Sequence, residues 1–384
     1  MALASSIMRA LLLITVGLPI AFQASASPTQ HFPEQYSPLN NDRRSPYNEK
    51  PKPSPLKRPH STCKNPLIRK DWRALTTSEK SAYISAVQCL GDKKKAKSIS
   101  GIPGLQTRYD DFQGVHSVQT PFIHWVGFFI LWHRYFIATY EKTLRELCGY
   151  KGAQPYWDWT IDNASNKDMA EWPVFDNHTG FGGNGPYIDG PNPFSIPERT
   201  GGGCVPKGPF TWPKWVVGLG PGASLEYSPH CLSRDFSRPL MAWATKDLVH
   251  WVQDVDKYED FAFRLENVPI FTVPNVHGAG HFGVGGALGA MGDVYGSPGD
   301  PLFYLHHSSL DRLLWKWQQK NLPARYYDVG GPVVPFDYHN LQGPNITLSF
   351  QIGLGKLAPN VTLAKIMDLQ GEVLCYDYDY NSCE

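Results

Sequence analysis

The sequence predicts a mainly α-helical protein, with a helical core that resembles a four-helix bundle, long irregular loops and a few short β-strands. Two helix-start signals support the helices. Thr76-Thr77-Ser78-Glu79 forms a capping box, and Asp300-Pro301 places an N-cap residue before a proline. The loops follow from composition, because 33 prolines and 35 glycines in 384 residues favour long connections between a modest number of helices.

The composition is that of a folded chain with balanced charge. The chain is 42% hydrophobic and 13% aromatic, which is enough apolar surface for a sizeable core. Its 36 lysines and arginines face 35 aspartates and glutamates. We therefore expect no nucleic-acid partner and no acidic disordered region.

The first 60 residues divide into two segments. Residues 1–26 are predicted to be a secretory signal peptide, with an apolar run before the small-residue cleavage site Ala24-Ser25-Ala26. Residues 27–60 are rich in proline and polar residues and are expected to form a flexible extension. Two dibasic pairs in it are either processing sites or part of a solvated linker: Arg43-Arg44 and Lys57-Arg58.

Residues 61–384 are expected to form the folded domain of a secreted, extracellular protein. No stretch after the signal peptide has the length of a transmembrane helix, so no membrane partner is expected. Four N-x-S/T sequons predict surface N-glycans at Asn163, Asn177, Asn345 and Asn360.

The seven cysteines are predicted to form disulfides rather than a metal site. Their spacings are wide, no C-x-x-C occurs, and the secretory context favours oxidation. Because seven is odd, one thiol is unpaired or pairs between chains. The expected local pairs are Cys204–Cys231 and Cys375–Cys383, whereas the partners of the other three stay open: Cys63, Cys89 and Cys148.

The first helix is predicted from Thr76, its N-cap, to Leu90. The stretch 112–140 then carries His116, His124 and His133 among aromatic residues. His124 and His133 are nine residues apart, which at about 100° per residue puts them on opposite faces of one helix. On one continuous helix they could not both bind the same metal ion, so the helix must not include both. Pro121 favours a break after His116, which leaves His124 on an irregular link and His133 in a helix over about 126–147.

The second half has its own pattern of histidines. Residues 160–240 are expected to be a long connection, and helical character returns at about 241–263. His277 and His281 lie at i and i+4, on one face of a helix. The glycines beside and after them predict a loop: Gly278, Gly280, Gly283, Gly285, Gly286, Gly289 and Gly292.

The helix that starts at Asp300-Pro301 should run to about Lys320 and carries His306 and His307. Adjacent residues are about 100° apart around a helix, so only one of the two is expected to point at a metal. The tail, residues 321–384, alternates turns with short apolar runs and predicts a few strands, which close at Cys375-Tyr376-Asp377-Tyr378.

Two triplets of imidazoles from two helical regions predict a binuclear metal site within the helical core. Neutral imidazole is the commonest nitrogen ligand of transition metals. A set of histidines without a carboxylate fits copper better than magnesium or calcium. Zinc also accepts imidazole, but zinc hydrolases commonly add a carboxylate or thiolate, and no H-E-x-x-H is present. Two copper ions are therefore expected.

These residues resemble the central domain of tyrosinases, catechol oxidases and haemocyanin units over roughly residues 63–384. The resemblance is carried by the spaced histidines, Tyr156-Trp157-Asp158-Trp159 and the string Asp300-Pro301-x-Phe303-x-x-His306-His307-x-x-x-Asp311. It implies a type-3 copper pair that uses O2 on a small phenolic substrate. The implied ligands are His116, His124 and His133 for one copper, and His277, His281 and His307 for the other.

Two further features differ from those of many fungal members of this family, and a third resembles them. Many fungal members have a cysteine cross-linked to the second histidine, where this chain has Phe122. From the short stretch after His307, we expect no C-terminal lid domain of the kind found in long fungal tyrosinases, and the features resemble the short, secreted fungal type. Arg69 and Tyr376-x-Tyr378 resemble the pair that ties the start of the domain to its end, by a cation–π contact.

Asp311 has two possible roles. It lies one helical turn past His307, so its carboxylate could orient a ligand imidazole. A plain salt bridge to Arg134 or Arg312 is the alternative.

Three residues bear on the substrate. Members with strong monophenolase activity often have asparagine directly after the first histidine of the second copper site, where this chain has Gly278. Glu266 could supply the accompanying carboxylate, and Phe282, which is bulky and apolar, is expected to narrow the entrance. We expect oxidation of o-diphenols or o-aminophenols to o-quinones, with weak or no monophenol hydroxylation. The alternatives are a true tyrosinase and, in another class, an oxygen-carrying haemocyanin-like protein.

Overall fold

The computed structural model describes residues 63–267 and 273–379, all of which belong to one compact unit. The predicted signal peptide, the predicted extension and Cys383 lie outside the described residues. Within the described part of the chain, none of the helices combines the length and apolar character needed to cross a membrane.

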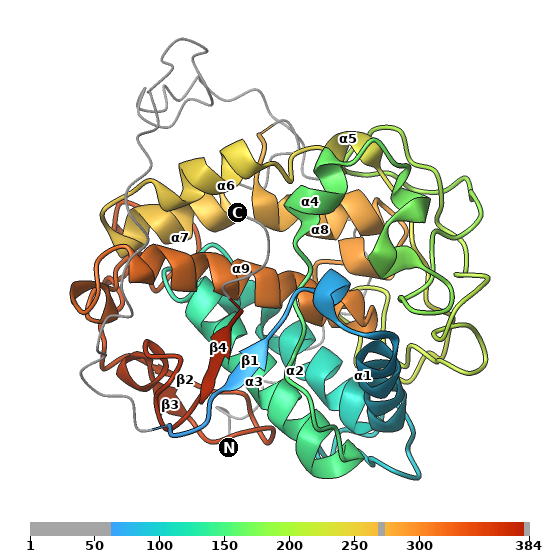
Figure 1. Cartoon of the computed structure of the whole chain (residues 1–384), viewed down its shortest axis with the longest axis horizontal. Helices are drawn as coiled ribbons and strands as arrows, with labels where there is room; N and C mark the ends of the chain where they lie inside the picture. The colour runs from blue at the N-terminus through green and yellow to red at the C-terminus, as the bar shows by residue number, and fades with distance from the viewer. Residues whose placement is uncertain (1–62, 268–272, 380–384) are drawn as a thin grey trace, which may run out of the picture. The chain divides into compact units, whose positions relative to one another are not determined.

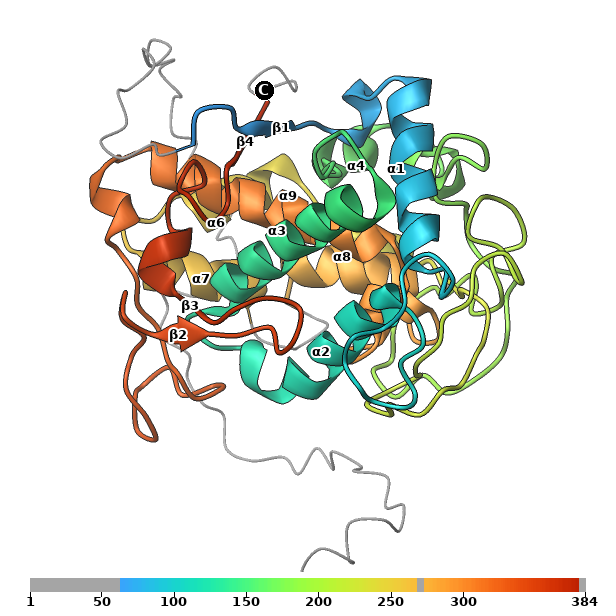
Figure 2. The same cartoon turned by 90° about the horizontal axis from the view of Figure 1, so that it is seen from below.

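Four helices form the centre of the fold (Figures 1 and 2): α2 Arg108–Ile123, α3 Phe129–Cys148, α8 Val276–Gly285 and α9 Leu302–Gln319. Helix α9 packs against α3 and α8, and α2 packs against α3. Helix α9 buries nearly all of its residues, as expected for a helix surrounded by others. The predicted mainly helical fold with a helical core is confirmed.

Helix α1, Thr77–Leu90, forms where the capping box predicts it. The hydroxyl of Thr76 accepts a hydrogen bond from the backbone N–H of Glu79, whose carboxylate accepts from the N–H of Thr76. These two bonds satisfy donors that the first helical turn leaves without partners. A disulfide, Cys89–Cys148, joins the end of α1 to the end of α3.

The remaining helices are short. Residues 160–240 form mainly irregular structure, and the predicted Cys204–Cys231 disulfide is present within it. The short α-helices are α4 Trp159–Ala164, α5 Arg238–Met241, α6 Lys246–Gln253 and α7 Tyr258–Glu266. The 3-10 turns are η2 Trp72–Ala74, η3 Met169–Glu171, η4 Pro173–Phe175, η5 Ala290–Gly292, η6 Ser297–Gly299, η7 Ala324–Tyr326 and η8 Leu363–Ile366.

Two small sheets complete the described structure. Strand β1, Leu67–Arg69, pairs in parallel with β4, Tyr376–Tyr378. Strands β2, Gln351–Ile352, and β3, Val361–Thr362, pair antiparallel. The predicted strands of the tail are thus present, whereas β1 was not predicted from the sequence.

The β1–β4 pairing also changes the disulfide assignment. Cys63 bonds to Cys375, so the predicted Cys375–Cys383 pair is wrong. The two strands bring the start of the described chain beside its end, and this spatial closeness decides the pairing. The prediction paired Cys375 with Cys383 because they are close along the chain, and closeness along the chain takes no account of tertiary contacts.

Two details of the central helices differ from the prediction. Helix α2 continues through Pro121 to Ile123. A proline in the last turn removes one backbone donor, and the helix then ends two residues later. His116 therefore lies well inside α2, and His124 is the residue that caps its end. The irregular link at His124 and the helical position of His133 are as predicted.

The glycine-rich segment is also different, because four of its glycines lie inside α8 rather than in a loop: Gly278, Gly280, Gly283 and Gly285. Close packing explains them. A Cβ on Gly283 would lie 2.9 Å from the backbone of Met241, and a Cβ on Gly280 would overlap the ring of His306. These glycines let α8 approach its neighbours at backbone distance.

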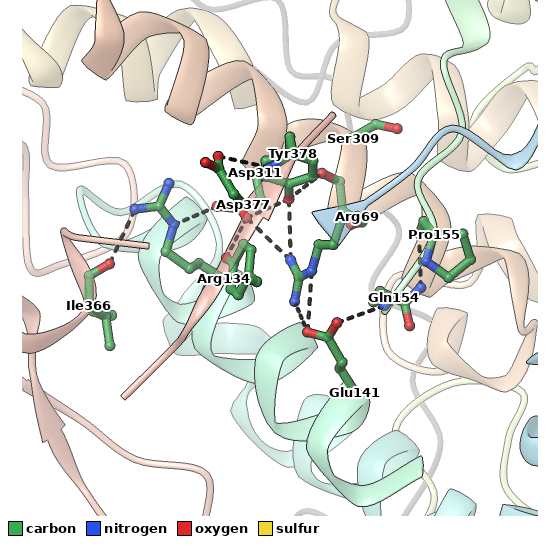
Figure 3. Close-up of polar contacts among 12 residues, drawn as sticks. Arg69, Arg134, Glu141, Gln154, Pro155, Ser309, Asp311, Ile366, Asp377 and Tyr378 are labelled. Carbon is green, nitrogen blue, oxygen red and sulfur yellow. Dashed lines mark hydrogen bonds and ion pairs between the residues drawn. The ribbon is translucent and has the colours of Figure 1, made fainter. Parts of the chain in front are cut away.

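A buried charge cluster ties β1 to the central helices (Figure 3). The Arg69 guanidinium donates to a carboxylate oxygen of Glu141 at 2.6 Å and stacks over the ring of Tyr376, 3.4 Å from its centroid. It also lies 5.8 Å from the ring centroid of Tyr378. The predicted cation–π link between the start and the end of the domain is therefore present.

Asp311, on α9, lies at the centre of this cluster. Its carboxylate accepts from Arg134 Nε at 2.5 Å, and from the hydroxyls of Tyr376 and Tyr378 at 2.6 Å each. Arg69 lies 3.4 Å away. The salt-bridge alternative for Asp311 is therefore correct, and the role in orienting an imidazole is wrong, because both oxygens are committed on the side of the cluster.

Candidate metal centre

The fold brings the histidines into two facing groups. The ligand atoms of His116, His124 and His133 lie within 4.8 Å of one another, and the same holds for the group of His277, His281, His306 and His307. The first group comes from α2, its C-cap and α3. The second comes from α8 and α9. Across the two groups, the rings of His133 and His307 stack with centroids 4.3 Å apart.

Backbone carbonyls fix the orientation of four of these rings. Each Nδ1 lies at hydrogen-bond distance from a carbonyl oxygen: His116 from Tyr295 at 2.9 Å, His124 from Thr120 at 3.0 Å, His133 from Phe129 at 2.9 Å and His281 from Met291 at 2.9 Å. A carbonyl only accepts, so each Nδ1 carries the proton. Each Nε2 is then left with a lone pair directed into the site.

The Nε2 atoms of the two histidine groups are arranged to bind a cation. Within the described residues, the buried Nε2 atoms of His116, His133 and His277 have no hydrogen-bond partner. The Nε2 atoms of His281 and His307 lie 3.1 Å apart. Buried polar atoms normally have partners, and lone pairs that converge repel unless something positive lies between them. The donor set is all nitrogen, which suits copper.

The pKa values of the histidines also favour a metal site. Burial lowers the pKa of His124 and of His281 to about 4. Burial, together with the neighbouring imidazoles, also lowers the pKa of the other four well below the ordinary value: His116, His133, His277 and His307. The rings are therefore neutral at neutral pH, which is the form that binds a metal.

Hydrogen bonding distinguishes the two adjacent histidines of α9. The indole N–H of Trp159 donates to His306 Nδ1 at 3.1 Å, and His306 Nε2 donates to the carbonyl of His277 at 3.1 Å. Both nitrogens of His306 are therefore occupied. The ring of His307 instead faces His133 and His281, which supports the assignment of His307 as the ligand.

The three residues expected to affect the substrate lie on two helices: Glu266 on α7, and Gly278 and Phe282 on α8. Glu266, at the end of α7, is buried, and its Oε2 accepts from the N–H of Trp125 at 2.6 Å. Its Oε1 has no hydrogen-bond partner within the described residues, and burial raises the pKa of this carboxyl well above its ordinary value. The residue that links it to His124 is Trp125, which the sequence reading did not single out.

Gly278 and Phe282 both lie on α8. The N–H of Gly278 donates to the side-chain oxygen of Asn275, the N-cap of the helix. Phe282 is half-buried, and its ring centroid lies 6.4 Å from that of Phe194.

Two phenylalanines that the sequence analysis did not predict, Phe129 and Phe303, lie between the two histidine groups. Phe129 lies 4.6 Å from the ring of His133, and Phe303 lies 4.1 Å from the ring of His307.

Gly280 offers a direct test of the close approach of α8 to α9. We expect Gly280→Ala to destabilise the protein by about 1–3 kcal/mol, because the added methyl group overlaps the ring of His306 and forces the helices apart. Urea unfolding of the metal-free protein measures the change. Gly183→Ala is the control, since a Cβ there meets nothing within 4 Å. Equal stability of the two variants would contradict the packing argument.

Comparison with known proteins agrees with this geometry. Residues 106–320 match the family model described as the common central domain of tyrosinase. A tyrosinase-like protein of Diaporthe leptostromiformis is 35% identical over 342 residues, which cover 84% of this chain and 82% of that protein. Tyrosinase P of Aspergillus terreus is 33% identical over 347 residues, covering 83% and 94%.

Among solved structures, a variant polyphenol oxidase from Thermothelomyces thermophila is similar with a TM-score of 0.70 and 32% identity, over 81% of this chain and 88% of that one. The match to the family model spans more than half of the chain, and it includes the histidines of the first group and those of the second. The chain therefore belongs to the tyrosinase family.

Proposed function

We propose that this protein is a copper oxidase that uses O2 to oxidise o-diphenols to o-quinones or o-aminophenols to o-quinone imines. The tyrosinase family is a type-3 binuclear copper family that acts on phenolic substrates with O2. The observation that carries the proposal is the pair of facing histidine groups, whose neutral rings direct lone pairs into one buried site.

In this proposal, His116, His124 and His133 hold one copper ion, and three histidines of α8 and α9 hold the other: His277, His281 and His307. The copper pair would supply the redox couple that passes electrons from the phenol to O2. The protein contributes fixed orientation, because carbonyl acceptors hold the rings before any metal binds. The phenylalanines between the groups exclude water from the reacting centre.

The preference for diphenols rests on Glu266 and Gly278. A monophenol must lose its hydroxyl proton before it can be hydroxylated, which calls for a positioned base. One oxygen of Glu266 is occupied by the N–H of Trp125, and burial favours the protonated carboxyl. Gly278 provides no side chain to help hold a water molecule, and the amide oxygen of Asn275 is taken by the N–H of Gly278. Phe282, half-buried on the same helix, narrows the space for the substrate.

Initial rates with a monophenol and its matching catechol test this preference. We expect the catechol to be oxidised roughly 100-fold faster, which is the lower end of what a positioned general base contributes. Quinone formation is followed by absorbance on the copper-loaded protein. Equal rates for the two substrates would contradict the proposal and indicate a true tyrosinase. Reversible O2 binding without catechol turnover would indicate an oxygen carrier.

We also propose that the protein is secreted and glycosylated. Three disulfides within the described residues support an oxidising compartment. Three of the four sequon asparagines are exposed: Asn177, Asn345 and Asn360. Asn163 is half-buried, and its amide nitrogen donates to the carbonyls of Ala242 at 3.3 Å and Ala244 at 3.0 Å. A glycan replaces one of the two amide hydrogens, so glycosylation of Asn163 would leave one N–H for these two acceptors.

A further inference from the structure

Phe336 combines two features that are unusual for a bulky apolar residue. Its backbone is left-handed, with φ of 64°, and its side chain is 51% exposed. Bulky residues rarely adopt positive φ, and such strain persists where the surroundings enforce it, often at functional sites. A glycine would adopt this conformation without strain. A large apolar ring that is half in solvent is therefore kept at a position where the backbone favours glycine.

The ring of Phe336 is connected to the metal centre through a single aromatic residue. It stacks on Trp125, with centroids 4.7 Å apart and planes 18° apart. Trp125 directly follows His124, and their rings lie 5.8 Å apart. Trp125 also has a left-handed backbone, with φ of 54°. Its N–H donates to Glu266 at 2.6 Å, and its carbonyl accepts from the N–H of Phe336 at 3.0 Å.

The loop around Phe336 is built by its neighbours rather than by its ring. The carboxylate of Asp337 accepts the backbone N–H groups of Leu341, Gln342 and Gly343 at 2.7–2.9 Å. Tyr338 packs against Phe263 on α7, with ring centroids 4.9 Å apart. One face of the Phe336 ring is covered by Trp125, and the exposed half of the side chain is available for a further contact.

One of the histidines assigned to metal is partly exposed. Of the six histidines assigned to metal, His277 is half-buried, whereas the other five are buried. His124 stacks on His277, with ring centroids 6.1 Å apart and planes 18° apart. The pair formed by Trp125 and Phe336 adjoins His124, and the N–H of Trp125 donates to Glu266. The aromatic pair therefore lies on the side of the centre where His277 is partly exposed.

We propose that Phe336 determines substrate specificity. While the phenol ring of a substrate lies at the metal centre, an apolar or aromatic substituent on that ring packs against the exposed part of the Phe336 side chain. The preferred substrate class is then a catechol or o-aminophenol that carries a second ring, rather than the unsubstituted compound. This inference rests on the proposed function, because it assumes that a phenol ring binds between the two histidine groups.

The experiment compares ligands with and without a second ring on the copper-loaded full chain. Calorimetry gives the dissociation constants of biphenyl-4-carboxylate and benzoate, and steady-state assays give KM for 4-phenylcatechol and catechol. We expect Phe336→Gly to weaken binding of the two-ring compounds roughly three- to tenfold, the range for one aromatic pair. The single-ring compounds should be unaffected. Phe336→Tyr should restore the preference, and Tyr327→Ala, at another exposed aromatic residue, should leave it unchanged.

Thermal unfolding separates recognition from a structural role. Because glycine relieves the left-handed strain, Phe336→Gly should unfold at the same or a higher temperature while the preference is lost. Equal weakening of one-ring and two-ring compounds, or no weakening, overturns the inference. If the wild-type protein binds the carboxylates with the expected preference but oxidises no catechol, the proposed function fails and the role of Phe336 in recognition stands.

Discussion

His307→Gln is expected to lower the copper content from two ions to one per chain and to reduce catechol oxidation by more than about 100-fold. Substitutions that disturb only the partners of a ligand already lower metal affinity or activity by about 10- to 100-fold, and loss of the ligand should exceed that. The ring of His307 faces the opposite group, 4.3 Å from His133 and with its Nε2 3.1 Å from that of His281. No other nitrogen of α9 can replace it, because His306 is committed elsewhere.

His306→Gln is the matched control, one residue away on the same helix. A glutamine amide can accept from the indole of Trp159 through its oxygen and donate to the carbonyl of His277 through its nitrogen, as His306 does. We expect this variant to keep two copper ions and most of its activity. Copper content by elemental analysis and resistance to a copper chelator are measured for both. If His306→Gln lost copper and His307→Gln kept it, the assignment of the ligand would be reversed.

Asp311→Ala is expected to lower the free energy of unfolding by about 3–5 kcal/mol, the usual cost of breaking a buried ion pair. The variant removes the carboxylate that pairs with both Arg134 and Arg69, and it leaves Arg69 its ion pair with Glu141. It also removes the acceptor of the hydroxyls of Tyr376 and Tyr378. The contacts of β4 with the core should therefore weaken along with the ion pairs.

Urea unfolding of the metal-free protein measures this change without interference from copper. The control is Glu146→Gln, which removes the exposed partner of Lys142 at 3.8 Å on α3. Exposed pairs contribute about 0–1 kcal/mol, so this variant should be nearly neutral. A loss below about 1 kcal/mol for Asp311→Ala would mean that the cluster is not the main link between the chain ends and the helical core.

Several features followed directly from local sequence. The capping box at Thr76 formed as predicted, because both of its hydrogen bonds join residues three apart. The spacing of nine residues between His124 and His133 was enough to place them on different elements, since helical geometry is fixed. The pair His277 and His281 lies on one helix for the same reason.

One of the errors has a local cause, and the others depended on contacts between distant segments. Pro121 did not stop α2, because the helix tolerated the loss of one donor in its last turn. The glycines of α8 predicted a loop by composition, but they serve close packing against His306 and Met241. No role was predicted for Phe336, because neither its left-handed backbone nor its contact with Trp125 is visible in the sequence.

By itself, the sequence determined the helical class, the family and the two sets of histidines, because helix periodicity and capping are local and ligand chemistry belongs to residue types. Tertiary structure alone decided that Cys375 bonds to Cys63 and that Asp311 serves the arginine cluster. It also decided that His306 uses both of its nitrogens away from the metal site. These outcomes depend on which segments meet in space, and spacing along one chain does not contain that information.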